Sequence, residues 1–245
     1  MIIAAGGDVH ANISFVEKFY KEVAAPYNAD VIVQVGDTTL AWSRNVIEDF
    51  LDQVNALAVK YGIPFYFIDG NHEDFYTLFQ KYMQDHTEGF VELRANVFYI
   101  PRGFAWEWDG VRFMGFGGAF SVNYASLTEF VNWFPEEEAS FSDIERALSR
   151  GEVDVLFCHD APSTIRFMDE LYAGIEIAGC TRNRDTLLKV CESAKPDLLI
   201  HGHHHVSYEE DWAAPWGAVK VRGLAADYTY DVMSDTYMIV DTSVF

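Results

Sequence analysis

Short apolar runs recur along the chain, and each is followed at once by polar residues. Five such runs lead into Asp8-Val9-His10, Asp37, Asn71-His72-Glu73, His159-Asp160 and His203-His204-His205. Short runs that are rich in valine, isoleucine and phenylalanine are typical of buried strands. The pattern therefore predicts five strands, each with polar side chains where it ends.

Segments with helical spacing lie between these runs, at about 12–25, 43–60, 136–149 and 182–193. Pro26, Gly62 and Gly151 stand near the ends of three of them, where helix-breaking residues belong. Alternating strands and helices predict an α/β fold. Because no repeat, low-complexity tract or linker interrupts the sequence, we interpret residues 1–245 as a single domain.

The alternation of strands and helices ends near residue 205. Strand-like segments at 206–208, 218–221 and 237–241 follow one another without helices between them, and 111–118 is a further strand candidate. We expect these segments to form a second, mixed or antiparallel sheet that stacks on the first. The segments 119–135 and 160–181 have weak periodicity and are expected to be loops over the site.

Histidines gather in the predicted strand-end clusters. Of the eight in the chain, six belong to these clusters and His201 ends the apolar run before the last one, so only His86 lies apart from them. Ligands of an open α/β sheet collect at the carboxyl ends of its strands, and imidazole suits zinc, iron and manganese while carboxylates suit harder ions. The sequence therefore predicts a centre for two metal ions, whose donors are Asp8, His10, Asp37, Asn71, His159, His203 and His205.

A pair of ions would explain these residue types. One aspartate carboxylate can bridge two metals that lie ~3.5–4 Å apart, and such a pair clamps a phosphoryl group and acidifies bound water. Asn71 adds an oxygen ligand without further negative charge, so an anionic ester can approach. Residues two apart share a face of an extended chain. We therefore expect each of the pairs Asp8-x-His10 and His203-x-His205 to serve neighbouring ions, with the intervening side chain pointing away.

The order of these motifs resembles that of the calcineurin-like metallophosphoesterases, which reads DxH, GD, GNHE, H and GHxH. Here the motifs stand as Asp8-Val9-His10, Gly36-Asp37, Gly70-Asn71-His72-Glu73, His159 and Gly202-His203-His204-His205. They span residues 8 to 205 and so frame most of the chain. The resemblance implies an α/β fold of four layers, an αββα sandwich in which two mixed sheets are flanked by helices.

The resemblance also implies a role for each residue of the motifs. One ion would be bound by Asp8, His10 and His205, the other by Asn71, His159 and His203, with Asp37 as the bridge. His72 would be catalytic together with Asn71. It would protonate the leaving oxygen or stabilise the transition state, a task that suits an imidazole with a pKa of ~6.5.

One position departs from the family pattern. The family usually reads GDxxD, and Leu40 stands where the second acid is expected. Because that acid often orients the catalytic histidine, either another group orients His72 or catalysis is weaker. The candidates for this other group are Asp69, Asp74 and a threonine hydroxyl.

Charge and composition narrow the classes of partner. The chain has 38 acidic and 17 basic side chains and a formal charge of −21, which disfavours a nucleic-acid polymer or an anionic membrane as partner. It lacks the ~20 uninterrupted apolar residues of a membrane helix and the basic start of a signal peptide. Its three cysteines show no CxxC spacing. We expect a cytoplasmic protein.

The predicted function is hydrolysis of a small phosphate ester. We favour a phosphodiesterase acting on small diesters such as 2',3'- or 3',5'-cyclic nucleotides, because the chain is acidic and aromatic-rich loops flank the predicted site. The alternatives are a phosphomonoesterase of broad specificity and a non-catalytic scaffold with the same fold. Mn²⁺ is the preferred ion, with Fe, Zn, Ni or Co as alternatives, and a homodimer stays open.

Overall fold

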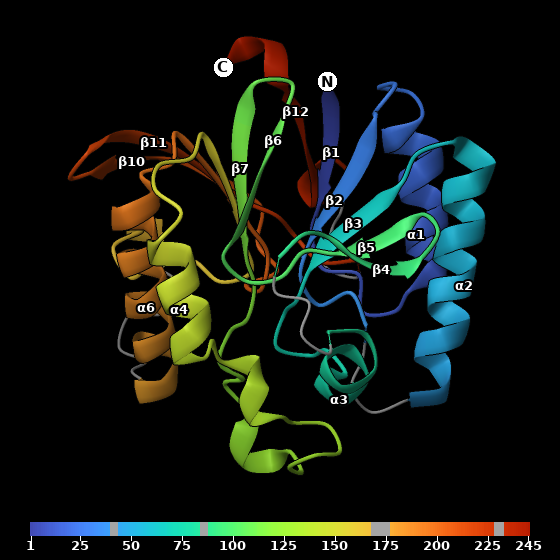
Figure 1. Cartoon of the computed structure of the whole chain (residues 1–245), viewed down its shortest axis with the longest axis horizontal. Helices are drawn as coiled ribbons and strands as arrows, with labels where there is room; N and C mark the ends of the chain where they lie inside the picture. The colour runs from blue at the N-terminus through green and yellow to red at the C-terminus, as the bar shows by residue number, and fades with distance from the viewer. Residues whose placement is uncertain (40–43, 84–87, 168–176, 228–232) are drawn as a thin grey trace.

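Two mixed sheets form the centre of the computed structural model (Figure 1). The structure describes residues 1–39, 44–83, 88–167, 177–227 and 233–245. Within these ranges each sheet has six strands, and helices cover the outer faces of both sheets (Figure 1). The four-layer α/β sandwich that the sequence predicted is therefore confirmed.

The first sheet has the strand order β12-β1-β2-β3-β5-β4. Its strands are β12 (Tyr237–Asp241), β1 (Ile2–Gly6), β2 (Val31–Val35), β3 (Phe65–Ile68), β5 (Val97–Tyr99) and β4 (Val91–Arg94). The four central strands are parallel, whereas β12 and β4 run antiparallel at the two edges. β1 and β2 read as nearly continuous apolar runs because layers cover both faces of the sheet.

The second sheet has the order β10-β11-β9-β8-β7-β6. Its strands are β10 (Tyr208–Ala214), β11 (Gly217–Gly223), β9 (Leu198–His201), β8 (Val155–Cys158), β7 (Val111–Phe116) and β6 (Phe104–Trp108). The strands from β11 to β7 are parallel, and antiparallel hairpins with β10 and β6 complete the edges. The carboxyl ends of β8 and β9 thus lie at one end of this sheet.

Helices cover each sheet on the side away from its partner. α1 (Ile13–Phe19), extended by a π-helical turn (Tyr20–Ala24), and α2 (Arg44–Tyr61) cover the first sheet, while α4 (Phe141–Leu148) and α6 (Ala178–Ala194) cover the second (Figure 1). The short α3 (Phe75–Thr77) continues into a π-helical segment (Leu78–Met83). The described ranges also contain four short 3₁₀ turns, at Tyr124–Ser126, Pro135–Glu137, Met233–Thr236 and Thr242–Val244. No helix in the described ranges is both long and apolar enough to cross a membrane.

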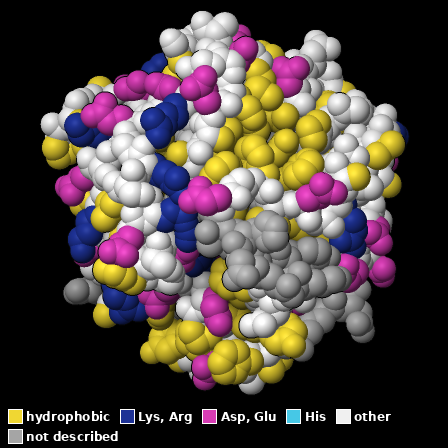
Figure 2. Space-filling view, in the orientation of Figure 1, with side chains coloured by type: hydrophobic (Ala, Val, Ile, Leu, Met, Phe, Trp, Pro, Cys, Tyr) yellow, Lys and Arg dark blue, Asp and Glu magenta, His cyan; other side chains and the backbone are white. Residues whose placement is uncertain are grey.

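Apolar side chains fill the space between the two sheets. Ile3 and Val33 of the first sheet and Phe113 and Phe157 of the second are completely buried in one cluster. Burying a side chain of this size contributes about 1.5–3 kcal/mol. On the face that is turned to the viewer, hydrophobic side chains reach the surface over the first sheet and beside β6 (Figure 2). Phe113 and Phe157 thus belong to the core between the two sheets.

The expected elements are present, but their boundaries are shifted and three strands lie in a different sheet from the one expected. The helix predicted at 136–149 begins only at Phe141, because Ser140 caps it and Pro135–Glu137 form a separate turn. The helix predicted at 182–193 begins at Ala178. Segment 237–241 forms a strand, but it pairs with β1 in the first sheet instead of joining the second. The second sheet instead takes β8 and β9, because strand pairing rather than chain order decides membership.

Candidate metal centre

The polar clusters of the sequence meet at one end of the sandwich. Three of them follow β1, β2 and β3 in the first sheet, and two follow β8 and β9 in the second. All five strands are parallel to a neighbour within their own sheet, so their carboxyl ends gather where loops converge. This end lies at the bottom of Figure 1.

The first group of side chains, here called the carboxylate half, consists of Asp8, His10, Asp37 and His205. Their donor atoms all lie within 4.8 Å of one another. The Nε2 of His205 is 2.9 Å from an oxygen of Asp8, and the Nε2 of His10 is 3.5 Å from Oδ2 of Asp37. Both carboxylates are buried. Two buried carboxylates and two imidazoles therefore face one small volume.

The second group, here called the amide half, consists of Asn71, His159 and His203. Oδ1 of Asn71 lies 3.1 Å from Nε2 of His159, and the rings of His159 and His203 meet edge to face at 5.0 Å. The same Nε2 is 3.4 Å from Oδ1 of Asp37. Asp37 thus presents one oxygen to each half, which would allow its carboxylate to bridge two ions.

The hydrogen bonds of His159 indicate what its Nε2 faces. Its Nδ1 lies 2.8 Å from the carbonyl oxygen of Val35, which can only accept, so Nδ1 carries a proton. In the neutral ring Nε2 then has a lone pair, and it points to the same place as Oδ1 of Asn71. Two lone pairs at this separation need a positive group between or beside them. A proton on Nε2 or a metal ion meets that need.

The electrostatics of the centre favour added positive charge. Burial opposes ionisation of Asp37, but His159 and His72 hold the pKa of its carboxyl well below the usual range. Burial likewise opposes protonation of His159, yet the charge of Asp37 raises its pKa to about 10. The buried carboxylates therefore draw protons onto neighbouring imidazoles, and divalent cations would supply the same compensation. The donor set fits two such ions.

Strained backbone shapes the loops that carry these side chains. His10, Asp37, His203 and His205 have φ angles of 49°, 51°, 64° and 55°. The left-handed region costs an ordinary residue roughly 1–2 kcal/mol. The expectation that the DxH and HxH pairs lie on extended chain is therefore wrong. Strain of this kind persists where surrounding structure fixes a functional arrangement.

Two motif glycines are needed because carboxylates pass close to them. A Cβ at Gly70 would overlap the side chain of Asp37, and one at Gly202 would overlap Asp8. Backbone N–H groups of the same loops hold these carboxylates. The N–H of His72 donates to Oδ1 of Asp37 at 2.8 Å, and that of His203 donates to Asp8 at 3.1 Å. The glycines thus let each loop approach a carboxylate of the site.

Asp227 supports the carboxylate half, and sequence reasoning missed it. Its Oδ1 lies 3.0 Å from Nδ1 of His10, and its Oδ2 accepts a hydrogen bond from Asn12 at 2.7 Å. Its own N–H donates to the carbonyl of Asp8. A carboxylate behind a histidine fixes the ring and raises its basicity as a metal ligand. Asp227 belongs to none of the motifs, so no signal in the sequence identified it.

Glu73 joins the loops that follow β2 and β3. Its carboxylate accepts hydrogen bonds from the N–H groups of Thr38 and Thr39, at 2.7 and 2.9 Å, and from the hydroxyl of Thr39. Burial, reinforced by the charge of Asp37, raises the pKa of Glu73 to about 7. The last residue of the GNHE motif therefore holds Asp37 and Asn71 on neighbouring loops.

Two histidines outside the expected ligand set have structural contacts. His204 is paired with Asp160 at 3.0 Å, and Asp160 also accepts a hydrogen bond from Asn183 of α6 at 2.7 Å. Donor atoms of these two residues and of His203 lie within 4.8 Å of one another. Because Asp160 and His204 satisfy each other, they anchor the loop of His203 to α6. His201 is buried and contacts the hydroxyl of Tyr208 at 2.6 Å, and His86 lies outside the described residues.

His72 lies half-buried beside the carboxylate half, with its ring centre 6.4 Å from that of His10. The three groups proposed to orient it have other partners. Asp69 accepts hydrogen bonds from Tyr99 and Arg102, Asp74 caps α3, and the hydroxyl of Thr39 donates to Glu73. Leu40 lies outside the described residues. In the described part of the chain these groups are thus engaged in other contacts.

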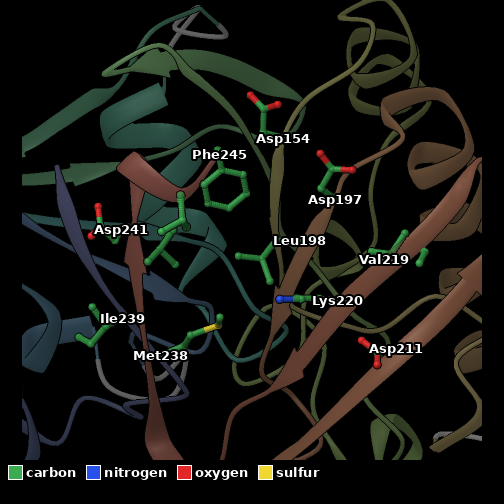
Figure 3. Close-up of a pocket in the computed structure, with 13 residues that line it drawn as sticks. Asp154, Asp197, Leu198, Asp211, Val219, Lys220, Met238, Ile239, Asp241 and Phe245 are labelled. Carbon is green, nitrogen blue, oxygen red and sulfur yellow. The ribbon is translucent and has the colours of Figure 1, made fainter.

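A hollow of about 550 Å³, separate from the strand-end site, lies at the other end of the sheets (Figure 3). Met238 and Ile239 of β12 line one side, and Leu198 and Lys220 line the other (Figure 3). Its polar groups are carboxylates and one lysine, and no histidine is among the described residues that line it. It therefore lacks the mixed donor set of the strand-end site.

Known proteins resemble this chain in sequence pattern and in fold. The sequence profile described as Calcineurin-like phosphoesterase matches residues 1–207. A dimetal phosphatase from Danio rerio superposes with a TM-score of 0.56 at 12% identity, covering 97% of this chain and 91% of its own. A protein of Thermus thermophilus superposes with a TM-score of 0.53 at 11% identity and covers 98% of both chains. A search among curated proteins finds no match.

The profile covers most of the chain, including every motif of the strand-end site. The two solved structures share its fold over nearly their whole length. The chain therefore belongs to the calcineurin-like phosphoesterase family, whose members hydrolyse phosphoesters with the help of bound metal ions.

Proposed function

We propose that this chain hydrolyses small phosphodiesters at a dinuclear metal centre, with cyclic nucleotides as the preferred class of substrate. One observation carries the proposal. Asp37 directs Oδ2 toward His10 at 3.5 Å and Oδ1 toward His159 at 3.4 Å, so a single buried carboxylate connects two sets of donors. Two cations held this way clamp both oxygens of an in-line phosphoryl displacement.

The two halves would each hold one ion. Asp8, His10 and His205 would hold the first, Asn71, His159 and His203 would hold the second, and Asp37 would bridge them. Mixed imidazole and oxygen donors suit borderline divalent metals, so Mn²⁺ is the preferred ion, with Fe, Zn, Ni and Co as alternatives. When bound, the ions would acidify a water molecule and neutralise the phosphoryl oxygens.

His72 would be the residue that moves a proton. Its backbone is fixed by the hydrogen bond from its N–H to Asp37, and its ring reaches the rim of the carboxylate half. A protonated imidazole can donate its proton to a leaving oxygen. Asn71 would act with it by holding a neutral oxygen at the second ion, which limits the negative charge that the ester meets.

The preference for small diesters rests on the surroundings of the centre. The formal charge of −21 disfavours long polyanions. Hydrophobic side chains gather at the bottom of the molecule over the loop after β7, on the same end as the centre (Figure 2). They include Val122, Tyr124, Phe130 and Val131, each about half exposed. An organic group on a small ester could pack there.

Turnover of two nitrophenyl esters tests the function. With Mn²⁺ added, we expect faster hydrolysis of bis(p-nitrophenyl) phosphate than of p-nitrophenyl phosphate, followed by hydrolysis of cyclic nucleotides. His72→Ala should lower turnover about 10²–10⁴-fold while metal analysis still finds about two ions per chain. Faster hydrolysis of the monoester would contradict the proposed diesterase activity and indicate a phosphomonoesterase. Two bound ions without any turnover would indicate a scaffold.

A further inference from the structure

We propose that Ser121 and Glu137 are positioning residues that fix the orientation of the Asn71 amide, and thereby the affinity of the amide half for its ion. The inference rests on the proposed function, because it assigns Asn71 as a ligand of the second ion. Both residues lie in the stretch that follows β7. The sequence predicts a loop around Ser121 (119–135) but a helix from residue 136, whereas Glu137 lies in the separate turn Pro135–Glu137.

A chain of buried hydrogen bonds runs from Asn71 to Glu137. The Nδ2 of Asn71 donates to the hydroxyl oxygen of Ser121 at 3.0 Å, and that hydroxyl donates to Oε2 of Glu137 at 2.6 Å. Asn71, Ser121 and Glu137 are 4%, 1% and 0% exposed. Water therefore cannot take over these contacts, and each buried donor needs its partner.

The proton of the Ser121 hydroxyl sets the direction of the whole chain. Oε1 of Glu137 already accepts from the N–H of Ser121 and from Nε1 of Trp133, both at 2.9 Å. Its other oxygen, Oε2, accepts from the Ser121 hydroxyl. With its only proton directed to Glu137, that hydroxyl can only accept from the Asn71 side. The Asn71 group that faces Ser121 must therefore be the NH₂.

This direction decides which atom of Asn71 meets the ion. With NH₂ held by Ser121, the carbonyl oxygen is turned to Nε2 of His159 and to the shared centre. The two ends of an amide have nearly the same shape, so packing alone would not prevent a flip. A flipped Asn71 would present two N–H donors to a cation. The buried carboxylate of Glu137 therefore acts on the metal site through Ser121.

The surrounding structure keeps Glu137 in place. Arg102 donates to the carbonyl oxygens of Glu136 and Glu137 and is paired with the buried carboxylate of Asp69, two residues before Asn71. One buried arginine thus connects the backbone at Glu137 to the loop that carries Asn71. Arg102 thus helps to hold Glu137 and Asn71, the two ends of the hydrogen-bond chain, at a constant separation.

Glu137→Gln is the sharpest test, because it keeps the size of the side chain. The new amide oxygen can accept the two N–H donors at Oε1, which leaves an NH₂ group facing Ser121. The Ser121 proton must then turn toward Asn71, which favours the flipped amide. Burial raises the pKa of Glu137 to about 7, so titrations at about pH 8 keep the parent carboxylate ionised. We expect about 10- to 100-fold weaker Mn²⁺ binding at one of two sites by calorimetry.

Three further variants separate positioning from simple stability. Ser121→Ala removes the acceptor for Asn71 and should weaken the same ion by a similar factor, whereas Ser121→Thr keeps the hydroxyl and should restore parental binding. Trp133→Phe removes one donor to Glu137 but leaves the chain to Asn71 intact. This control variant should leave the Mn²⁺ affinity of both sites unchanged. If the effects came from general destabilisation of the loop, it would lower the affinity as well.

The inference would be overturned if Glu137→Gln and Ser121→Ala bound both ions within about twofold of the parent, since orientation of a ligand normally changes affinity more than this. Equal weakening by Trp133→Phe would also overturn it. Failure of the proposed function has a different signature, because the parent would then bind Mn²⁺ without hydrolysing either nitrophenyl ester. Calorimetry on the metal alone therefore tests the positioning role independently of turnover.

Discussion

The two halves of the candidate metal centre would hold a cation by different physical means. In the carboxylate half Asp8, Asp37 and Asp227 surround the rings of His10 and His205, so charge provides most of the attraction. In the amide half the donors besides Asp37 are a neutral amide and two imidazoles. Affinity there depends on which way neutral groups point. The comparison indicates that hydrogen-bond networks should matter more for the amide half.

The supporting contacts follow the same division. Asp227 contacts a ring of the carboxylate half directly, at 3.0 Å from His10. Behind the amide half, Ser121 and Glu137 act through one amide, and Asp160 contacts His204 rather than a proposed ligand. A negatively charged side chain next to the amide half would repel the anionic phosphate ester. Neutral donors with a polar support avoid that conflict.

Asp37→Asn should have the largest effect, because it removes the residue that the two halves share. Losing the bridging charge weakens both ions at once, and the lost stabilisation of a phosphoryl transition state amounts to several kcal/mol. We expect turnover of bis(p-nitrophenyl) phosphate to fall on the order of 10³-fold. Metal analysis should find fewer than two ions per chain.

An exposed carboxylate provides the matched control for this variant. Asp211→Asn makes the same chemical change on β10, far from the strand-end loops. It should leave turnover and metal content at the parental level. If Asp37→Asn kept two ions and ordinary turnover, the two halves would not share a bridge and the division between them would lose its basis.

The sequence predicts the strand-end site better than it predicts its supports. Asp8, Asp37 and His159 each follow an apolar run that is typical of a buried strand. Parallel strands bring their carboxyl ends together, so the convergence of these residues can be inferred from the short stretch of sequence around each of them. Asp227 is 217 residues from His10, and Ser121 is 50 residues from Asn71. Neither stands in a motif. Contacts of that kind arise from tertiary packing, which periodicity does not report.

The fold shows the same limit. Strand existence follows from apolar runs such as 31–35 and 155–158, which the structure contains as β2 and β8. Sheet membership does not, because β12 pairs with β1 across nearly the whole chain. The sequence also predicts extended chain at the DxH and HxH pairs, whereas His10 and His203 adopt left-handed backbone. Only the surrounding structure can impose such strain.

Asp227→Asn should produce an intermediate effect that is confined to the carboxylate half. The variant keeps the shape of the side chain but removes the charge that supports His10, so we expect one Mn²⁺ to bind about 10- to 100-fold more weakly. The other ion should keep its affinity. Calorimetric titration at constant pH would measure both dissociation constants.

Asp160→Asn is the matched control in the opposite half. Its carboxylate contacts His204 and Asn183 rather than a proposed ligand ring. It should leave the affinity of the carboxylate half unchanged. Equal weakening of the same ion by Asp227→Asn and Asp160→Asn would mean that both carboxylates support one ion. The proposal that charge determines affinity in one half and ligand orientation in the other would then be wrong.

The smallest expected effect concerns the pH dependence of stability in the metal-free protein. Burial opposes protonation of His10, but hydrogen bonds to Asp227 and Asp37 raise its pKa to about 10. Burial lowers the pKa of His203 to about 3. The unfolded value for both is ~6.5. A raised pKa adds stability that is complete below ~6.5 and is lost as pH rises toward the folded value, and a lowered pKa has the opposite consequence.

Acidification from about pH 7.5 to about pH 5.5 should therefore increase the contribution of His10 by about 1.4 kcal/mol and decrease that of His203 by about the same amount. Urea unfolding of chelator-treated protein at both pH values would measure this. His10→Asn should lose more stability on acidification than the parent, and His203→Asn should lose less. Changes of the same sign in both variants would contradict the comparison. Saturating Mn²⁺ should abolish the difference, because a coordinated imidazole releases its proton in either half.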